Sequence, residues 1–251
     1  MAGHNKWSKV KRLKGALDAK RGKLFSRLSK EIAVAARLGG GNPAFNPRLR
    51  SAVLAARVQS MPSDNIERAI RKGCGEIETG SIEEIIYEGY APGGVAVLVE
   101  TATDNRNRTA ADMRSIFTKH HGNLGSSGSV AYLFERVGEM TLLLSAASEE
   151  RVLEVILEAG ARELSADDDH HIIITPPDQL YAVAEALKQA GLETDSQKLT
   201  FIPQTTSAVD DTATARRILL LCEALEENDD VLNVHSNAGI SDDVLAGFAL
   251  H

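Results

Sequence analysis

Basic side chains gather between Lys6 and Lys30 of this 251-residue chain. A dense group of lysine and arginine can neutralise several phosphates and release their counterions, which gives salt-sensitive affinity that is largely independent of base sequence. Trp7 lies among these cations, where its ring could stack on a base or instead anchor the segment to a neighbouring helix. The residues predicted to bind nucleic acid here are Lys6, Trp7, Lys9, Lys11, Arg12, Lys14, Lys20, Arg21, Lys23, Arg27 and Lys30.

A second candidate for anion binding is the segment TDNRNRT at residues 103–109, between a predicted strand and a predicted helix. The first turn of a helix offers free backbone amides, and arginine adds bidentate donors for phosphate. We therefore add Arg106 and Arg108 to the predicted nucleic-acid-binding residues. The alternative is an Asn cap followed by two solvated arginines. A third segment, residues 122–129, has glycine at every third position, so it could approach a ligand closely or simply connect two elements.

Signatures of catalysis and of metal binding are absent from the sequence. The G-x-S-x-G, H-E-x-x-H, C-x-x-C and Walker patterns do not occur. The cluster DDDHH at residues 167–171 has metal-ligand residue types, but it falls where a tight hairpin is predicted, and adjacent turn residues rarely converge on one ion. Cys74 and Cys222 are too few and too far apart for a disulfide framework or a four-thiolate zinc site. The sequence predicts a protein that is not an enzyme and that needs neither metal nor cofactor.

The distribution of charge divides the chain into a basic and an acidic part. The net charge of the whole chain is −7. Residues 1–75 contain 17 Lys and Arg against 4 Asp and Glu, a net charge of +13, whereas residues 76–251 contain 11 against 31, a net charge of −20. This division indicates a polyanion-binding part attached to an acidic body, and a solvated basic surface without a partner is the alternative. The acidic body would scaffold the basic part or contact a protein partner.

Three helices are predicted to carry many of the basic residues. Residues 20–38 place apolar side chains within one arc of about 120° and cations within a separate arc of about 100°. Asn46-Pro47 predicts the start of a second helix, which continues to about residue 60. A third helix is expected over residues 64–73. Its outward-facing cations are Arg68, Arg71 and Lys72.

The rest of the chain alternates strands and helices. Strands are predicted at residues 85–90, 95–103 and 130–135, with a helix over 105–120. Residues 138–203 have the order β-α-β-β-α-β of a ferredoxin-like unit, and one more helix and strand follow it. The predicted fold class is α+β, an N-terminal three-helix domain followed by two ferredoxin-like α/β domains. The predicted domains are a basic arm and helical domain over 1–75, a discontinuous α/β domain over 81–137 plus 204–251, and an inserted domain over 138–203.

The same sequence predicts where the protein resides. No window approaches 18 consecutive apolar residues, so no membrane span is expected. The basic N-terminal segment lacks the apolar core of a secretory signal, and the two cysteines suit a reducing compartment. A cytoplasmic location is therefore predicted.

Several motifs resemble those of the YebC/PmpR family. The resemblance covers almost the whole chain, and its N-terminal part alone is highly specific. It is carried by AGHNKW at 2–7, DAKRGK at 18–23, LGGG at 38–41, NPRLR at 46–50, MPSDNIERAI at 61–70, YEGY at 87–90, TDNRNRT at 103–109, NLG at 123–125, GSVAY at 128–132, DDV at 229–231 and NV at 233–234.

This resemblance implies three domains, a helical one and two α/β domains, with the last inserted into the second. Proteins of the family are described mostly as cytoplasmic DNA-binding transcriptional regulators. Mitochondrial relatives act as translational activators, and some bacterial members act at the ribosome. Charge and resemblance together predict a non-enzymatic regulator of gene expression that binds DNA. The alternative is a ribosome-associated translation factor that binds ribosomal RNA.

Overall fold

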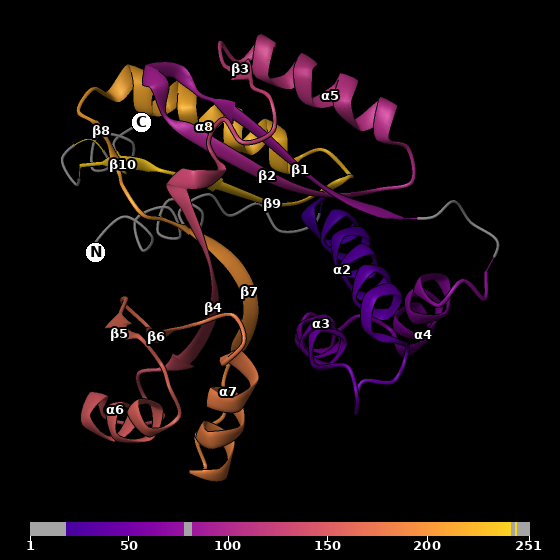
Figure 1. The fold of residues 1–251 in the computed structure, drawn as a ribbon, viewed down its shortest axis with the longest axis vertical. Coiled ribbons are helices and arrows are strands. Elements are labelled where there is room, and N and C mark those ends of the chain that lie inside the picture. Colours follow the sequence, from indigo (N-terminus) through magenta and orange to yellow (C-terminus); the bar gives the residue numbers. More distant parts are fainter. Residues whose placement is uncertain (1–18, 78–81, 242–243, 245–251) are drawn as a thin grey trace. The chain divides into compact units, whose positions relative to one another are not determined.

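The computed structural model describes residues 19–77, 82–241 and 244, and their side chains from Gly22 onward. The chain forms two compact units (Figure 1). The first consists of Met1–Glu135 together with Pro203–His251, and the second is Arg136–Ile202. The second unit is therefore inserted into the chain of the first.

Three helices form the N-terminal part of the first unit (Figure 1). Their bounds are α2 Ala19–Gly39, α3 Pro47–Val58 and α4 Ser63–Gly73. Apolar side chains at helical spacing meet in one small core, where Ile32 of α2 packs with Leu49 of α3 and Ile66 of α4. The helix α3 begins where the sequence predicts, because the Asn46 side chain accepts a hydrogen bond from the Leu49 N–H at 3.1 Å.

The end of α4 lies very close to α2. A Cβ atom built at Gly73 would overlap the carbonyl oxygen of Ala33 and would lie 2.8 Å from the Cβ of Ala36. Glycine at this position therefore allows the two helix backbones to approach each other.

An antiparallel four-stranded sheet forms the rest of the first unit, with strand order β3-β1-β2-β9. The strands are β1 Glu83–Tyr90, β2 Ala96–Thr103, β3 Asn123–Leu124 and β9 Val231–Ser236. Two helices, α5 Arg106–Lys119 and α8 Thr212–Glu226, cover one face of this sheet. Because side chains alternate along a strand, the opposite face is available to α2.

The contact between α2 and the sheet is apolar. Ala33 and Val34 of α2 pack with Ala102 of β2 and Leu232 of β9 in a small buried cluster. Beyond the sheet, a short parallel pair forms between β8 Ser207–Val209 and β10 Ala238–Ile240. This pair ties the segment that leaves the second unit to the segment that follows β9.

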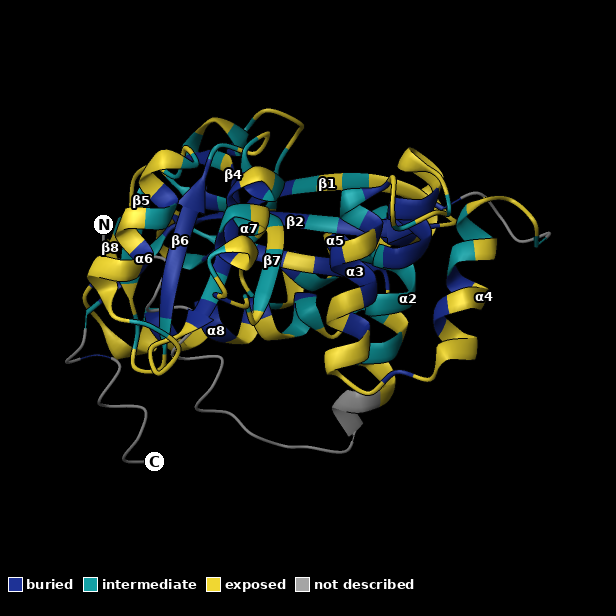
Figure 2. Cartoon of the chain, turned by 90° about the horizontal axis from the view of Figure 1, so that it is seen from below, coloured by how far each residue is buried: buried dark blue, intermediate teal, exposed yellow. Residues whose placement is uncertain are grey.

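The second unit is ferredoxin-like. Its elements are β4 Phe134–Leu143, α6 Glu149–Glu158, β5 Glu163–Ala166, β6 His170–Thr175, α7 Leu180–Gln189 and β7 Ser196–Pro203. The strand order is β5-β6-β4-β7, and the buried strand β6 is dark blue in Figure 2. Met140, Ile173 and Leu187 belong to a core that this unit forms by itself.

The predicted fold class is confirmed, because a helical N-terminal part precedes mixed α/β parts built on antiparallel sheets. One predicted strand, residues 130–135, is wrong over most of its length. Residues Ala131–Leu133 form a 3₁₀ turn, and β4 begins at Phe134. The N–H groups of Val130 and Ala131 are bound to the Glu88 carboxylate, so a strand ladder cannot use them. The three-domain boundaries stay a prediction.

Within the described part of the chain, no helix combines the length and the apolar character needed to cross a membrane.

Candidate nucleic-acid interface

Two cations predicted to bind nucleic acid contact the end of another helix. Lys23 Nζ donates to the backbone oxygen of Glu227 at 3.2 Å, and Arg27 Nη2 donates to that of Glu226 at 2.9 Å. These oxygens belong to the C-terminal end of α8, where carbonyls have no partner within the helix and the helix dipole is negative. Each of these two side chains therefore has one donor engaged at the end of α8, while a lysine ammonium has three N–H donors and a guanidinium has five.

A third cation of α2, Lys30, belongs to a cluster around Asp230. Lys30 Nζ lies 2.6 Å from one carboxylate oxygen, and Arg108 Nη2 lies 2.8 Å from the other. The hydroxyl of Thr109 donates to the second oxygen at 2.7 Å. Burial alone would raise the pKa of Asp230, but the hydrogen bonds from Lys30, Arg108 and Thr109 outweigh it and lower the pKa to about 2. The carboxylate therefore stays ionised and holds α2 to the start of α5.

The segment 103–109 forms a capped helix start. Asn105 accepts the N–H of Arg108 at 3.1 Å, as an Asn cap does. Arg108 also contacts Asp104 at 3.1 Å, so its guanidinium is shared between two carboxylates of this chain. The Arg106 side chain is exposed.

The glycine-containing loop at 122–129 wraps around an internal anion. The buried carboxylate of Glu88 accepts the N–H groups of Gly128, Val130 and Ala131, each at 2.7 Å. Burial raises the pKa of Glu88, but these three backbone hydrogen bonds outweigh it, so the pKa is lowered overall. The loop therefore has the amide arrangement of an anion site, and Glu88 occupies it. The segment also leads from α5 toward β4 and contributes the short strand β3, so it has the connecting role that was predicted as the alternative.

The cluster at residues 167–171 forms the turn of a hairpin between β5 and β6. The Asp167 carboxylate accepts the N–H groups of Asp169 at 2.9 Å and His170 at 2.8 Å. Among the residues that the structure describes, no group of three or more His, Cys, Asp or Glu could hold a metal ion.

Some cations of the helical part donate to no described residue, and we call these cations open. Arg48 and Arg50 are both engaged, the first with Glu31 and Glu84 and the second with two loop carbonyls. Among cations of α2, α3 and α4 with described side chains, four donate to no described residue. They are Arg57, Arg68, Arg71 and Lys72.

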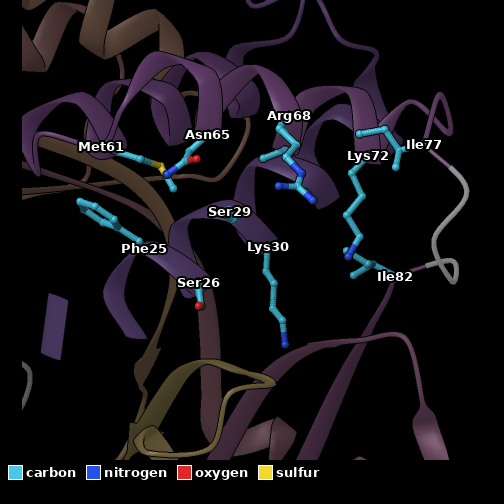
Figure 3. A pocket seen from close by; sticks show the side chains of 11 residues that line it. Phe25, Ser26, Ser29, Lys30, Met61, Asn65, Arg68, Lys72, Ile77 and Ile82 are labelled. Carbon is cyan, nitrogen blue, oxygen red and sulfur yellow. The ribbon is translucent and has the colours of Figure 1, made fainter. Parts of the chain in front are cut away.

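Two of these open cations, Arg68 and Lys72, line a groove of about 410 Å³ between α2 and α4. In Figure 3, Phe25, Met61 and Asn65 lie toward one end of the groove, and Lys72 lies toward the other. Asn65, Arg68 and Lys72 are spaced by three and four residues, which places them on one face of α4. The opposite wall comes from α2.

The sequence prediction did not include Arg68 and Lys72 among the site residues, although it placed them outward. The helical spacing of Asn65, Arg68 and Lys72 was the available signal, but the partner wall on α2 depends on how the helices pack. Of the predicted residues, Lys6, Trp7, Lys9, Lys11, Arg12 and Lys14 lie outside the described residues, as do the side chains of Lys20 and Arg21.

The fold and this groove define a class of α+β protein in which a cationic three-helix part precedes two antiparallel α/β parts. Comparison with known families identifies which one. Residues 5–76 match the TACO1/YebC protein N-terminal domain, and residues 82–238 match the TACO1/YebC second and third domain. The chain belongs to the TACO1/YebC family.

Relatives are similar over their whole length. A protein of Rubrobacter xylanophilus named "Probable transcriptional regulatory protein" is 53% identical over 250 residues, covering 99% of this chain and 100% of the relative. A protein of Aquifex aeolicus with the same name is 51% identical over 245 residues, covering 98% of each chain. The crystal structure of a conserved hypothetical protein from Aquifex aeolicus matches with a TM-score of 0.84 and 51% identity, covering 91% of this chain and 94% of that one.

Proposed function

We propose that this chain is a non-enzymatic regulator of gene expression that binds DNA through its basic N-terminal part, in the cytoplasm. The observation that supports this most is the pair of open cations, Arg68 and Lys72, in a groove of the helical part. The name of the two relatives of this chain, "Probable transcriptional regulatory protein", agrees with such a role.

The uneven distribution of charge along the chain determines which part of the protein a nucleic acid would approach. Residues 1–75 have a net charge of +13, and the remainder has −20. Phosphates are attracted to the first and repelled by the second, so a nucleic acid would reach the helical part in preference to the α/β parts. The acidic α/β parts remain available as the surface for a ribosome or protein partner.

The predicted contact residues form two groups under this proposal. The cations that precede Gly22, together with Arg68 and Lys72, contact phosphate directly. Lys23 and Arg27 contact phosphate through the N–H donors that the end of α8 does not occupy, whereas Lys30 is held by the Asp229 carbonyl and the Asp230 carboxylate. Arg106 is exposed and adds a peripheral contact, whereas Arg108 is held by Asp230.

Deletion of residues 1–18 tests the contribution of the basic segment. It removes five cations and leaves α2 complete, whereas a deletion to residue 30 would also remove Phe25 and Leu28, which pack against the helical core. Fluorescence anisotropy with a labelled DNA duplex, measured over a salt series, should show weaker binding and a smaller salt slope. Each lost phosphate contact lowers the slope by about 0.9.

The matching experiment for the groove is Arg68→Gln with Lys72→Gln in the full chain. Arg57→Gln with Arg71→Gln is the control, because these two open cations do not line the groove. We expect the groove pair to weaken binding more than the control pair. Equal affinities and salt slopes for the deleted, substituted and original proteins would contradict the proposal.

The nature of the nucleic acid is a separate question, because phosphate contacts carry no base sequence. Crosslinking in cells followed by sequencing of bound DNA and RNA together separates a promoter-binding regulator from a ribosome-associated factor. Recovery of promoter DNA supports the transcription proposal. Recovery of ribosomal RNA alone, with co-sedimentation on ribosomes, would replace it with the translational alternative.

A further inference from the structure

We infer that the groove between α2 and α4 binds an unpaired nucleotide of a single-stranded nucleic acid. The phosphate would lie at Arg68 and Lys72, and the base would lie toward Phe25 and Met61. This inference rests on the proposed nucleic-acid function, and it specifies the form of nucleic acid that the groove accepts.

The two ends of the groove differ in chemistry. Arg68 and Lys72 donate to no described residue, so their charges are available to a phosphate. The ammonium of Lys30, which also lines the groove, is already 2.6 Å from the carboxylate of Asp230. The cationic end therefore offers two donors to one phosphate and is not a continuous track for a duplex backbone.

The other end suits a base. Phe25 is half-buried and contributes an aromatic ring, and Met61 contributes a buried, polarisable thioether. Asn65 lines the same end with a side-chain amide that can both donate and accept, as the edge of a base requires. Aromatic and apolar surface beside an amide is the setting in which proteins stack and read unpaired bases.

Size and access favour a single strand over a duplex. The groove measures about 410 Å³, within the range of about 300–1,000 Å³ that small-molecule sites occupy. A duplex presents phosphates and sugars on its outside and keeps its bases stacked, so it would leave the apolar end empty unless a base were flipped out. An unpaired nucleotide fills both ends without that cost.

The substitution Phe25→Leu tests the base end. Leucine keeps apolar volume for the helical core while removing the ring. We expect affinity for a labelled oligo(dT) strand to fall by roughly five-fold or more, the loss of one stacking contact, while affinity for a DNA duplex stays unchanged. Phe45→Leu is the matched control, because Phe45 is 85% exposed and lies outside the groove. A larger effect from Phe45→Leu would overturn the inference.

A second measurement does not depend on the core residue Phe25. Asn65→Ala changes an exposed side chain, so the protein should keep its thermal midpoint and lose single-strand affinity selectively. In addition, a single strand carrying 5-iodouracil should crosslink on irradiation to the peptide that contains Phe25 or Met61. Crosslinks confined to other peptides, or parallel losses for single strand and duplex, would contradict the inference.

The outcomes separate this inference from the function on which it rests. If the original protein binds neither single strand nor duplex, the proposed function fails. If it binds both and Phe25→Leu, Asn65→Ala and the crosslinks all fail to mark the groove, only the inference fails.

Discussion

At the scale of single residues, the two segments whose sequences resemble anion-binding motifs each bind a carboxylate of this same chain. Asp230 receives Lys30, Arg108 and Thr109, and Glu88 receives three backbone amides. The sequence predicts the Asn cap at 105 as the alternative to an anion site, and this cap could be foreseen because a cap is a local interaction. The sequence could not predict that the anion is a side chain of the same chain, since Arg108 and Asp230 are 122 residues apart.

Substitution of Asp230 by Asn should destabilise the protein. The amide keeps an oxygen for Thr109 but removes the charge that compensates Lys30 and Arg108, and we expect the free energy of unfolding to fall by about 2 kcal/mol. Chemical denaturation followed by circular dichroism measures this. Asp229→Asn is the control, because that side chain is exposed and only its backbone oxygen contacts Lys30. Equal losses from both variants would count against the role of Asp230.

The stabilisation by Asp230 should depend on pH. Its pKa is lowered from 3.8 to about 2 in the folded protein, so the ionised carboxylate stabilises the fold fully above pH 4. As pH falls from about 4 to about 2, protonation removes this contribution. The difference in unfolding free energy between the original protein and Asp230→Asn should therefore be constant near neutrality and shrink in acid. A constant difference down to pH 2 would be inconsistent with the cluster.

At the scale of elements, the helix α2 serves three neighbours at once. Its apolar residues pack in the helical core and against the sheet, and its cations contact the end of α8. Periodicity predicts a helix with an apolar and a cationic face, and both exist. Periodicity does not predict that the cationic face would be covered, because the partner carbonyls come from an element near the other end of the chain. The prediction of a strand at 130–135 was wrong for the same kind of reason, because the N–H groups of Val130 and Ala131 bind the Glu88 carboxylate of another element.

The close approach of α4 and α2 gives a prediction at this scale. Gly73→Ala should destabilise the helical part by about 1–3 kcal/mol, since the new methyl group would meet the backbone of Ala33. Gly22→Ala is the contrasting variant, because a Cβ there meets nothing within 4 Å and alanine favours the helix. Thermal unfolding should move in opposite directions for the two. A neutral Gly73→Ala would show that the helices are not packed this closely.

At the scale of the whole molecule, the ends of the inserted unit are adjacent. The N–H of Gln204 donates to the carbonyl oxygen of Leu133 at 2.8 Å, where the chain leaves and enters the first unit. The second unit has its own core, which includes Met140 and Ile173. The β-α-β-β-α-β order predicted this unit well, because each element and turn in it has a local signal.

Excision of the insertion should therefore be tolerated. A chain in which a short Gly/Ser linker replaces residues 136–202 should keep the cooperative unfolding of the first unit, because Leu133 and Gln204 are already neighbours. Its nucleic-acid affinity should remain if the helical part alone provides the site. Differential scanning calorimetry and anisotropy measure the two properties. Loss of cooperative unfolding would show that the first unit needs the second.

The contacts of α2 with the end of α8 and with the turn that follows it also constrain how the protein is made. Lys23, Arg27 and Lys30 find their carbonyl partners 204, 199 and 199 residues further along the chain. At a synthesis rate of about 5–20 residues per second, those partners follow about 10–40 s later. Throughout that interval the nascent helical part carries its cations without their acceptors, beside ribosomal RNA. The docking of α2 onto the end of α8 and the residues that follow it is therefore among the last events of biosynthesis.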